Sequence, residues 1–116
     1  MALHTLGDLT VPIDVQVRYR QRVEQQGNGN LLTQRVIRDV GHCAFTSAEM
    51  TSAFDDLVDW VEYGNRPRGD DLLDAHAYRG PSAGCASTVN TASAENRVDL
   101  PTRLRLQAAY PACPSS

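Results

Sequence analysis

The stretch VIRDVGHCAFT at residues 36–46 joins a strand-like run to a Gly-His pair and then to a helix start. Apolar and polar residues alternate up to Val40, as they do in a β-strand with one buried face. His42 is therefore predicted on a short turn between a strand and a helix, where a side chain can be exposed and still firmly held. Imidazole gains and loses a proton near neutral pH, which suits general acid and base catalysis. Taken alone, the same pattern also fits an ordinary surface histidine in a loop.

The helix after this turn carries the clearest signals in the sequence. Thr46 and Glu49 have the spacing of a capping box, and Gly64 followed by Pro67 predicts the helix end. Between them, apolar residues repeat at intervals of three and four, as in an amphipathic helix. The apolar stripe, which we expect to pack against a sheet, consists of Met50, Phe54, Leu57, Val58 and Val61.

A similar strand, turn and helix are predicted at the N-terminus. Residues 2–5 are compatible with a buried strand, and the following Gly7 turn presents Asp8 at the C-terminal end of that strand. Pro12 then opens a helix that continues to about Gln26, where a run of glycine and asparagine ends it.

The second predicted strand, residues 32–40, leads directly to the histidine turn. It carries apolar residues on one face and Arg35 and Asp39 on the other, a polarity typical of a strand near a sheet edge. The order strand, Asp turn, helix, strand, His turn, helix predicts an α/β fold with parallel strands.

Parallel strands end at the same edge of a sheet, so Asp8 and His42 are expected to be neighbours in one crevice. An aspartate that accepts the Nδ1 proton of a histidine fixes its tautomer and stabilises the imidazolium. The Nε2 atom is then free to deprotonate a Ser, Cys or Thr nucleophile.

The composition predicts one small soluble domain. The chain has 116 residues, 41% of them hydrophobic and 22% charged, and a formal net charge of -3. This mild acidity without a basic run argues against nucleic acid or an anionic membrane as the main partner. No apolar run is long enough to span a membrane, and no signal peptide is visible. We expect either a cytosolic protein or an exported one whose signal peptide lies upstream.

Three cysteines occur, at Cys43, Cys85 and Cys113. Their spacing is not that of a zinc site, and neither a metal nor another cofactor is expected. Cys85 and Cys113 lie in a loop-rich region, where a disulfide would restrain a segment with little apolar surface and would indicate export. The alternative is that both are free thiols.

Three segments resemble the C-terminal third of an α/β-hydrolase, particularly exported bacterial esterase-like members. They are LHTLGDLTVP at 3–12, RDVGHCAFT at 38–46 and the helix end DWVEYG at 59–64. The resemblance covers residues 2–68 and implies Asp8 as the triad acid and His42 as the general base. In that family the nucleophile lies upstream on a strand-to-helix GxSxG elbow, which this sequence lacks before Asp8.

Two other residues are candidate nucleophiles. Ser82 lies in a GxSxG match at 80–84, but no apolar strand leads into it and the residues after it are poor helix formers. Cys43 adjoins His42, and neighbouring side chains usually point apart. We expect Cys43 to be buried beside the helix, or bonded to a cysteine in an absent segment. An acidic cluster at 70–76, with His76, is expected to be a solvated face rather than a metal site.

The sequence thus predicts residues 1–66 as the C-terminal portion of an α/β-hydrolase domain and 67–116 as an irregular extension, which a disulfide would tie down. The expected function is that of a C-terminal fragment of a serine hydrolase acting on carboxylic esters or related acyl substrates. Its partners would be the missing N-terminal part of that domain and a small ester substrate, without nucleic acid or membrane. The alternative is a catalytically inert binding module on a hydrolase-like scaffold.

Overall fold

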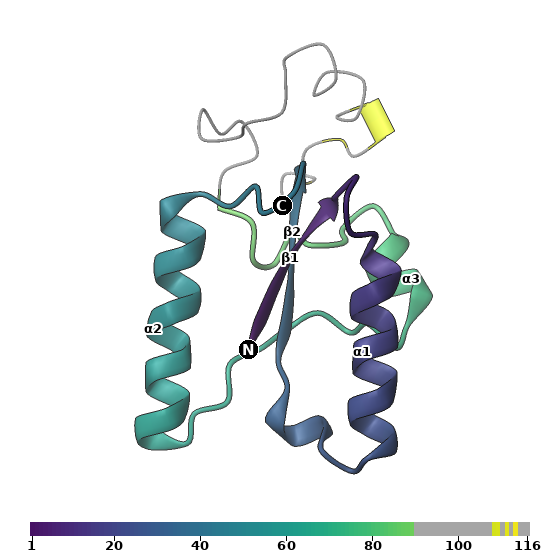
Figure 1. Ribbon diagram of the computed structural model, residues 1–116. Coiled ribbons are helices and arrows are strands. Elements are labelled where there is room, and N and C mark those ends of the chain that lie inside the picture. Colours follow the sequence, from purple (N-terminus) through teal and green to yellow (C-terminus); the bar gives the residue numbers. More distant parts are fainter. Residues whose placement is uncertain (90–107, 110, 112, 114–116) are drawn as a thin grey trace.

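A parallel pair of strands forms the centre of the computed structural model, which describes residues 1–89, 108–109, 111 and 113 (Figure 1). The elements follow in the order β1 (Ala2–Gly7), α1 (Ile13–Gln25), the short 3-10 helix η1 (Gly29–Leu31), β2 (Gln34–Val40), α2 (Ser47–Tyr63) and α3 (Ala75–Arg79). The strands lie between α1 on one side and α2 on the other. The predicted mixed α/β class with parallel strands is confirmed at this level.

The two strands pair in parallel and end at the same edge of the sheet. Ala2 pairs with Gln34 and Gly7 with Val40, with a register irregularity between Thr5 and Gly7. The strands approach closely at this end, because a Cβ added to Gly7 would lie 3.0 Å from the backbone oxygen of Asp39. The turns after both strands therefore lie side by side.

The main apolar cluster lies on the α1 side of the sheet. It consists of Leu6, Val17, Val36, Leu72, Tyr78 and Ala83, with the partly buried Ile13 packed against it. Half of these residues come from positions 67–89, which the sequence did not predict to be ordered. Leu72, Tyr78 and Ala83 are too few and too irregularly spaced to produce a recognisable pattern. Positions 90–107 of the predicted extension lie outside the described residues.

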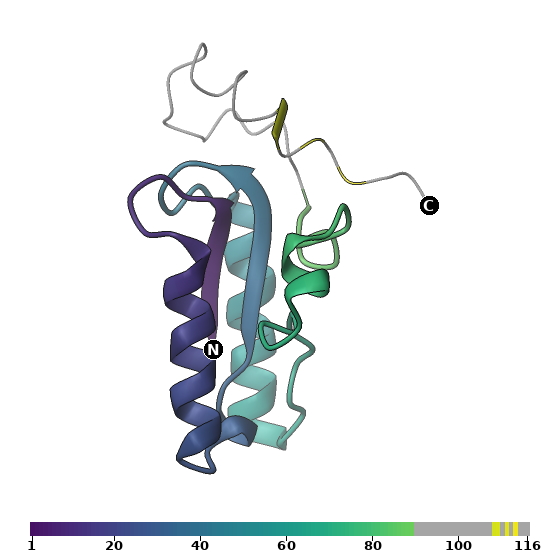
Figure 2. The same cartoon turned by 90° about the vertical axis from the view of Figure 1, so that its right-hand side faces the viewer.

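The segment after α2 runs along the outer edge of β2 (Figure 2). Asp70 N–H donates to the Gln34 carbonyl, and the Asp70 carboxylate accepts from Val36 N–H at 2.7 Å. Further along, Arg38 N–H donates to Thr88 Oγ1 at 2.7 Å. Burial raises the pKa of Asp70 despite the hydrogen bond from Val36. These contacts satisfy backbone groups that a third strand would otherwise pair with.

The predicted helix caps of α2 are confirmed. Thr46 Oγ1 accepts from Glu49 N–H, and the Glu49 carboxylate accepts from Thr46 N–H, which forms the capping box. Gly64 ends the helix in the left-handed conformation, with φ 75°.

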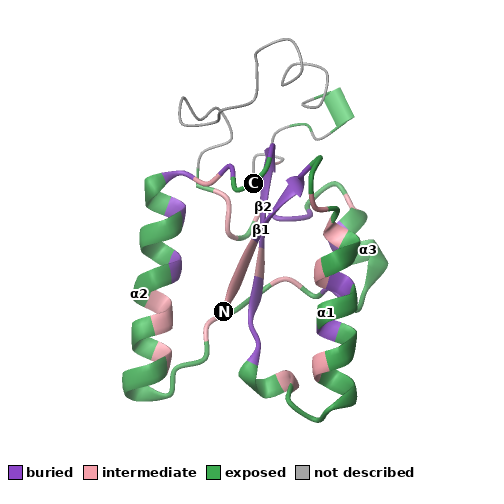
Figure 3. Ribbon diagram, viewed as in Figure 1, coloured by how far each residue is buried: buried purple, intermediate pink, exposed green. Residues whose placement is uncertain are grey.

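The prediction that the apolar stripe of α2 packs against the sheet is wrong. Phe54 is 65% exposed and Val61 77%, and Met50 and Val58 are also exposed (Figure 3). The buried positions of α2 are Glu49 and Ala53, one residue N-terminal to the stripe. Leu57 is the one half-buried member of the stripe, and the other four members remain uncovered.

No helix among the described residues is long and apolar enough to cross a membrane. The C-terminal segment is joined to the rest of the chain by a disulfide between Cys85 and Cys113, whose Cα atoms are 5.6 Å apart. Arg38 adds to this attachment, because its guanidinium donates to the carbonyls of Ala83 and Pro111.

Candidate active site

The carboxylate of Asp8 is held in a fixed orientation just after β1. Its Oδ1 atom accepts hydrogen bonds from Thr10 N–H at 2.7 Å and Val11 N–H at 2.8 Å. The side chain is only 2% exposed. A short polar side chain that binds amide groups two and three residues ahead is common in turns, which explains why the turn forms here.

The imidazole of His42 meets the other oxygen of this carboxylate. Its Nδ1 atom lies 2.8 Å from Asp8 Oδ2, and the histidine side chain is 52% exposed. The turn that carries it begins at Gly41, whose φ of 113° favours glycine and whose N–H donates to the Gly7 carbonyl. After His42, Ala44 N–H donates to Oγ1 of Thr5 in β1. Both turns are thus fixed to each other and to the ends of the strands.

This geometry separates the two imidazole nitrogens. With Nδ1–H donating to Asp8, the lone pair of the neutral ring lies on Nε2, which makes no hydrogen bond within the described part of the chain. An exposed Nε2 backed by a buried carboxylate can accept a proton from a hydroxyl or thiol placed beside it, and can later return that proton. Asp8 would stabilise the imidazolium formed in between.

The pKa of Asp8 lies below its ordinary value. Burial of the carboxylate opposes ionisation, but the hydrogen bonds from Val11 N–H, His42 and Thr10 N–H outweigh that effect. The folded protein therefore binds a proton at Asp8 less readily than the unfolded chain does.

We expect Asp8 to stabilise the fold in a pH-dependent way. Because its folded pKa is lowered, its contribution is fully present above the ordinary aspartate pKa of about 3.9 and is lost as the pH falls through the folded value. Urea unfolding between pH 2 and 6 should show a steeper loss of stability on acidification for the natural chain than for Asp8→Asn. Parallel curves for the two proteins would contradict this expectation.

Sequence reasoning missed His4, a third polar residue next to the pair. It is buried in β1, and its Nε2 atom donates to the Val11 carbonyl at 2.8 Å and lies 3.9 Å from Asp8 Oδ2. The sequence signal for His4 is an imidazole that alternates with apolar residues on the face of a strand expected to be buried.

Among the described residues, neither of the two nucleophiles suggested by the sequence is hydrogen-bonded to His42. Ser82 is exposed on a turn that follows α3 rather than a strand, so the 80–84 match is not a strand-to-helix elbow. No hydrogen bond joins Ser82 or Cys43 to His42 among the described residues. The expectation that Cys43 is buried beside the helix is wrong, because its thiol is exposed; its backbone has a positive φ of 52°. A bond to a cysteine in an absent segment stays a prediction.

Comparison with known proteins gives one partial similarity. A stretch of 67 residues, 58% of this chain, is 28% identical to an o-phthalyl amidase of Xanthobacter agilis. The stretch corresponds to 15% of the length of that amidase. The name of this relative is that of a hydrolase. No family model matches the chain, and no solved structure matches it.

Each aspartate of the acidic cluster at 70–76 accepts a hydrogen bond from a backbone N–H. The Asp70 carboxylate binds Val36 N–H, Asp71 accepts from Leu73 N–H, and Asp74 caps α3 by accepting from His76 N–H. Among the described residues, no group of three or more potential ligands is arranged to hold a metal ion.

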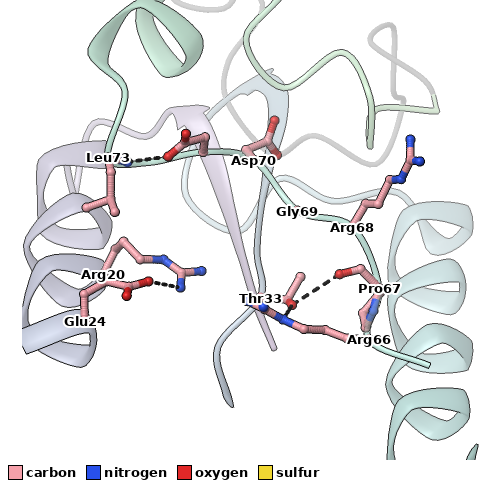
Figure 4. A pocket seen from close by; sticks show the side chains of 10 residues that line it. Arg20, Glu24, Thr33, Arg66, Pro67, Arg68, Gly69, Asp70 and Leu73 are labelled. Atoms are coloured by element: carbon pink, nitrogen blue, oxygen red, sulfur yellow. Dashed lines mark hydrogen bonds and ion pairs between the residues drawn. The ribbon is translucent and has the colours of Figure 1, made fainter. Parts of the chain in front are cut away.

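A cavity of about 410 Å³ lies at the beginning of β2, the opposite end of the sheet from His42 (Figure 4). Arg20 and Arg66 line it, and both donate to the carbonyls of Gly29 and Leu32. Both arginines therefore stabilise the connection from α1 to β2 around η1, and these hydrogen bonds occupy their guanidinium groups.

Proposed function

We propose that this chain supplies the acid and the base of a serine hydrolase of the α/β-hydrolase type, acting on carboxylic esters or related acyl compounds. The observation that carries the proposal is the contact between Asp8 Oδ2 and His42 Nδ1 at 2.8 Å, with Nε2 directed away from it on an exposed ring. The similarity to an amidase supports hydrolytic chemistry at an acyl carbon.

The proposed reaction follows from these positions. A serine hydroxyl attacks the acyl carbon while its proton passes to His42 Nε2, and Asp8 stabilises the resulting imidazolium. The imidazolium then gives its proton to the leaving alcohol or amine, which leaves an acyl-enzyme. Water attacks this ester, its proton passes to Nε2, and the serine is restored as the carboxylic acid departs.

We propose that the serine belongs to the remainder of the hydrolase domain, which covers the open side of this chain. Two features support such a partner. The outer edge of β2 is closed by the segment after α2, whereas the free edge of β1 has no neighbouring strand among the described residues. The exposed apolar stripe of α2 is also of a kind that partner surfaces cover.

A second candidate function is a catalytically inert binding module. It is favoured by the lack, within the described residues, of any hydroxyl or thiol bonded to His42 Nε2. We further propose that the protein is exported, because the Cys85–Cys113 disulfide is of a type that persists in oxidising compartments.

An activity-based fluorophosphonate probe, which labels activated serines, tests the hydrolase proposal. The whole reading frame that contains this sequence should be expressed and labelled, with and without His42→Ala. We expect one labelled serine outside residues 1–116, and loss of labelling in the His42→Ala protein. Labelling that is independent of His42 would contradict the proposal, and complete absence of labelling would favour the inert module.

We expect the 116-residue chain alone to remain unlabelled at Ser82. No hydrogen bond from the Ser82 hydroxyl to a histidine occurs among the described residues, and this serine lies on a turn without the strand that an elbow requires. Mass spectrometry of tryptic peptides after probe treatment would detect a modification. A labelled Ser82 would instead identify this chain as an enzyme by itself.

We expect the isolated chain to associate through the α2 stripe. Phe54→Glu places a charge in the middle of that stripe and should weaken self-association roughly tenfold, since like charges and lost apolar contact both oppose it. The matched control is Thr51→Glu, which adds the same charge to an exposed polar position of the same helix. Sedimentation velocity should show dissociation for Phe54→Glu alone. Equal behaviour of the two variants would exclude the stripe as the contact.

A further inference from the structure

His4 is linked to the pair formed by Asp8 and His42 through the turn after β1. Its imidazole is buried, and Nε2–H donates to the Val11 carbonyl at 2.8 Å. Val11 in turn donates its N–H to Asp8 Oδ1 at 2.8 Å. Val11 is therefore held at its carbonyl by His4 of β1 and at its N–H by the Asp8 carboxylate, which it helps to orient.

The Val11 carbonyl has no partner in the helix that follows. The first helical hydrogen bond runs from Val15 N–H to the Pro12 carbonyl, and Pro12 has no N–H of its own. Val11 is half-buried, and a carbonyl that is shielded from water without a donor is costly. His4 supplies the donor that the helix does not.

We propose that His4 is a positioning residue of the Asp8–His42 dyad. His4 fixes the turn at Val11 and thereby holds the Asp8 carboxylate toward His42. This inference rests on the function proposed above. His4 does not touch the reacting atoms. Its effect passes through Asp8, whose Oδ1 atom is anchored by the turn while Oδ2 faces His42.

The reactivity of His42 toward diethyl pyrocarbonate measures this effect. The reagent modifies unprotonated imidazole nitrogens, and an Nδ1–H fixed by Asp8 keeps the exposed Nε2 lone pair available. The exposed His76 on α3 serves as an internal reference, so the measured quantity is the ratio of the two modification rates, read by peptide mass spectrometry. We expect Asp8→Asn and His4→Leu each to lower this ratio about fivefold.

Two further variants separate the donor role of His4 from its size. His4→Gln replaces the imidazole but keeps an N–H donor of similar reach, and should restore the natural ratio. His4→Asn is too short to reach Val11 and should behave like His4→Leu, which also decides the matter should His4→Leu not fold. The double variant His4→Leu with Asp8→Asn should react no more slowly than Asp8→Asn alone, because both changes act on one interaction.

The outcomes distinguish the two proposals. A natural ratio in folded His4→Leu and His4→Asn, with a lowered ratio in Asp8→Asn, would overturn the role of His4 and leave the dyad intact. Failure of His4→Gln to restore the ratio, or additive effects in the double variant, would also overturn that role. An unchanged ratio in Asp8→Asn would overturn both the dyad and the positioning of it by His4.

Discussion

Replacement of His42 by alanine is expected to lower kcat for ester hydrolysis on the order of 10⁶-fold in the protein expressed from its whole reading frame. Loss of one member of a serine–histidine–acid triad removes nearly all of the acceleration that the triad provides as a unit. His42 is exposed on its turn, so the substitution removes no buried apolar surface. Hydrolysis of p-nitrophenyl acetate gives the rate.

The matched variant is Asp8→Asn, for which we expect a loss on the order of 10⁴-fold. Asparagine can still accept from the Thr10 and Val11 amides but presents no negative charge to His42. The double variant should be no slower than His42→Ala alone, because both residues act in the same proton transfer. A loss below tenfold in His42→Ala would show that this imidazole is not the base.

Removal of the Cys85–Cys113 disulfide is expected to cost about 3.5 kcal/mol of unfolding free energy. The two cysteines are 28 positions apart, and a cross-link over a loop of that length lowers the entropy of the unfolded chain by roughly this amount. The loss should be visible as a lower urea midpoint in Cys85→Ser with Cys113→Ser. Release of the Pro111 carbonyl from Arg38 adds to it.

The control for this change is Cys43→Ser, which replaces an exposed free thiol. Its urea midpoint should correspond to a stability within about 0.5 kcal/mol of the natural chain. Dithiothreitol should destabilise the natural protein but not the variant that lacks both bonded cysteines. An effect of the reductant on both proteins alike would contradict a stabilising role of the disulfide.

The contact between Asp8 and His42 was predictable because it depends on local signals and one rule of topology. Gly7 and Gly41 mark the strand ends, the capping box marks the helix after the histidine turn, and parallel strands end at a common edge. Such signals are contained within a few residues and do not require knowledge of the rest of the fold.

Features that depend on the surroundings were not predictable in the same way. The spacing of the α2 stripe identifies an amphipathic helix but not whether enough strands are present to cover it, and Phe54 is in fact exposed. The five-residue helix α3 is too short to show a period, although Tyr78 anchors it in the core. Cys43 is exposed and has a positive φ, a conformation uncommon for a residue other than glycine, and no sequence pattern predicted either feature.

The most direct test of the paired Asp8 and His42 is the proton NMR signal of the histidine Nδ1–H. Phe54→Glu provides a suitable background, because it leaves both residues in place and is expected to reduce self-association. With ¹⁵N-labelled histidine, we expect a low-field resonance from His42 that exchanges slowly with water and disappears in Asp8→Asn. Absence of such a resonance, or its persistence in Asp8→Asn, would contradict the proposed dyad.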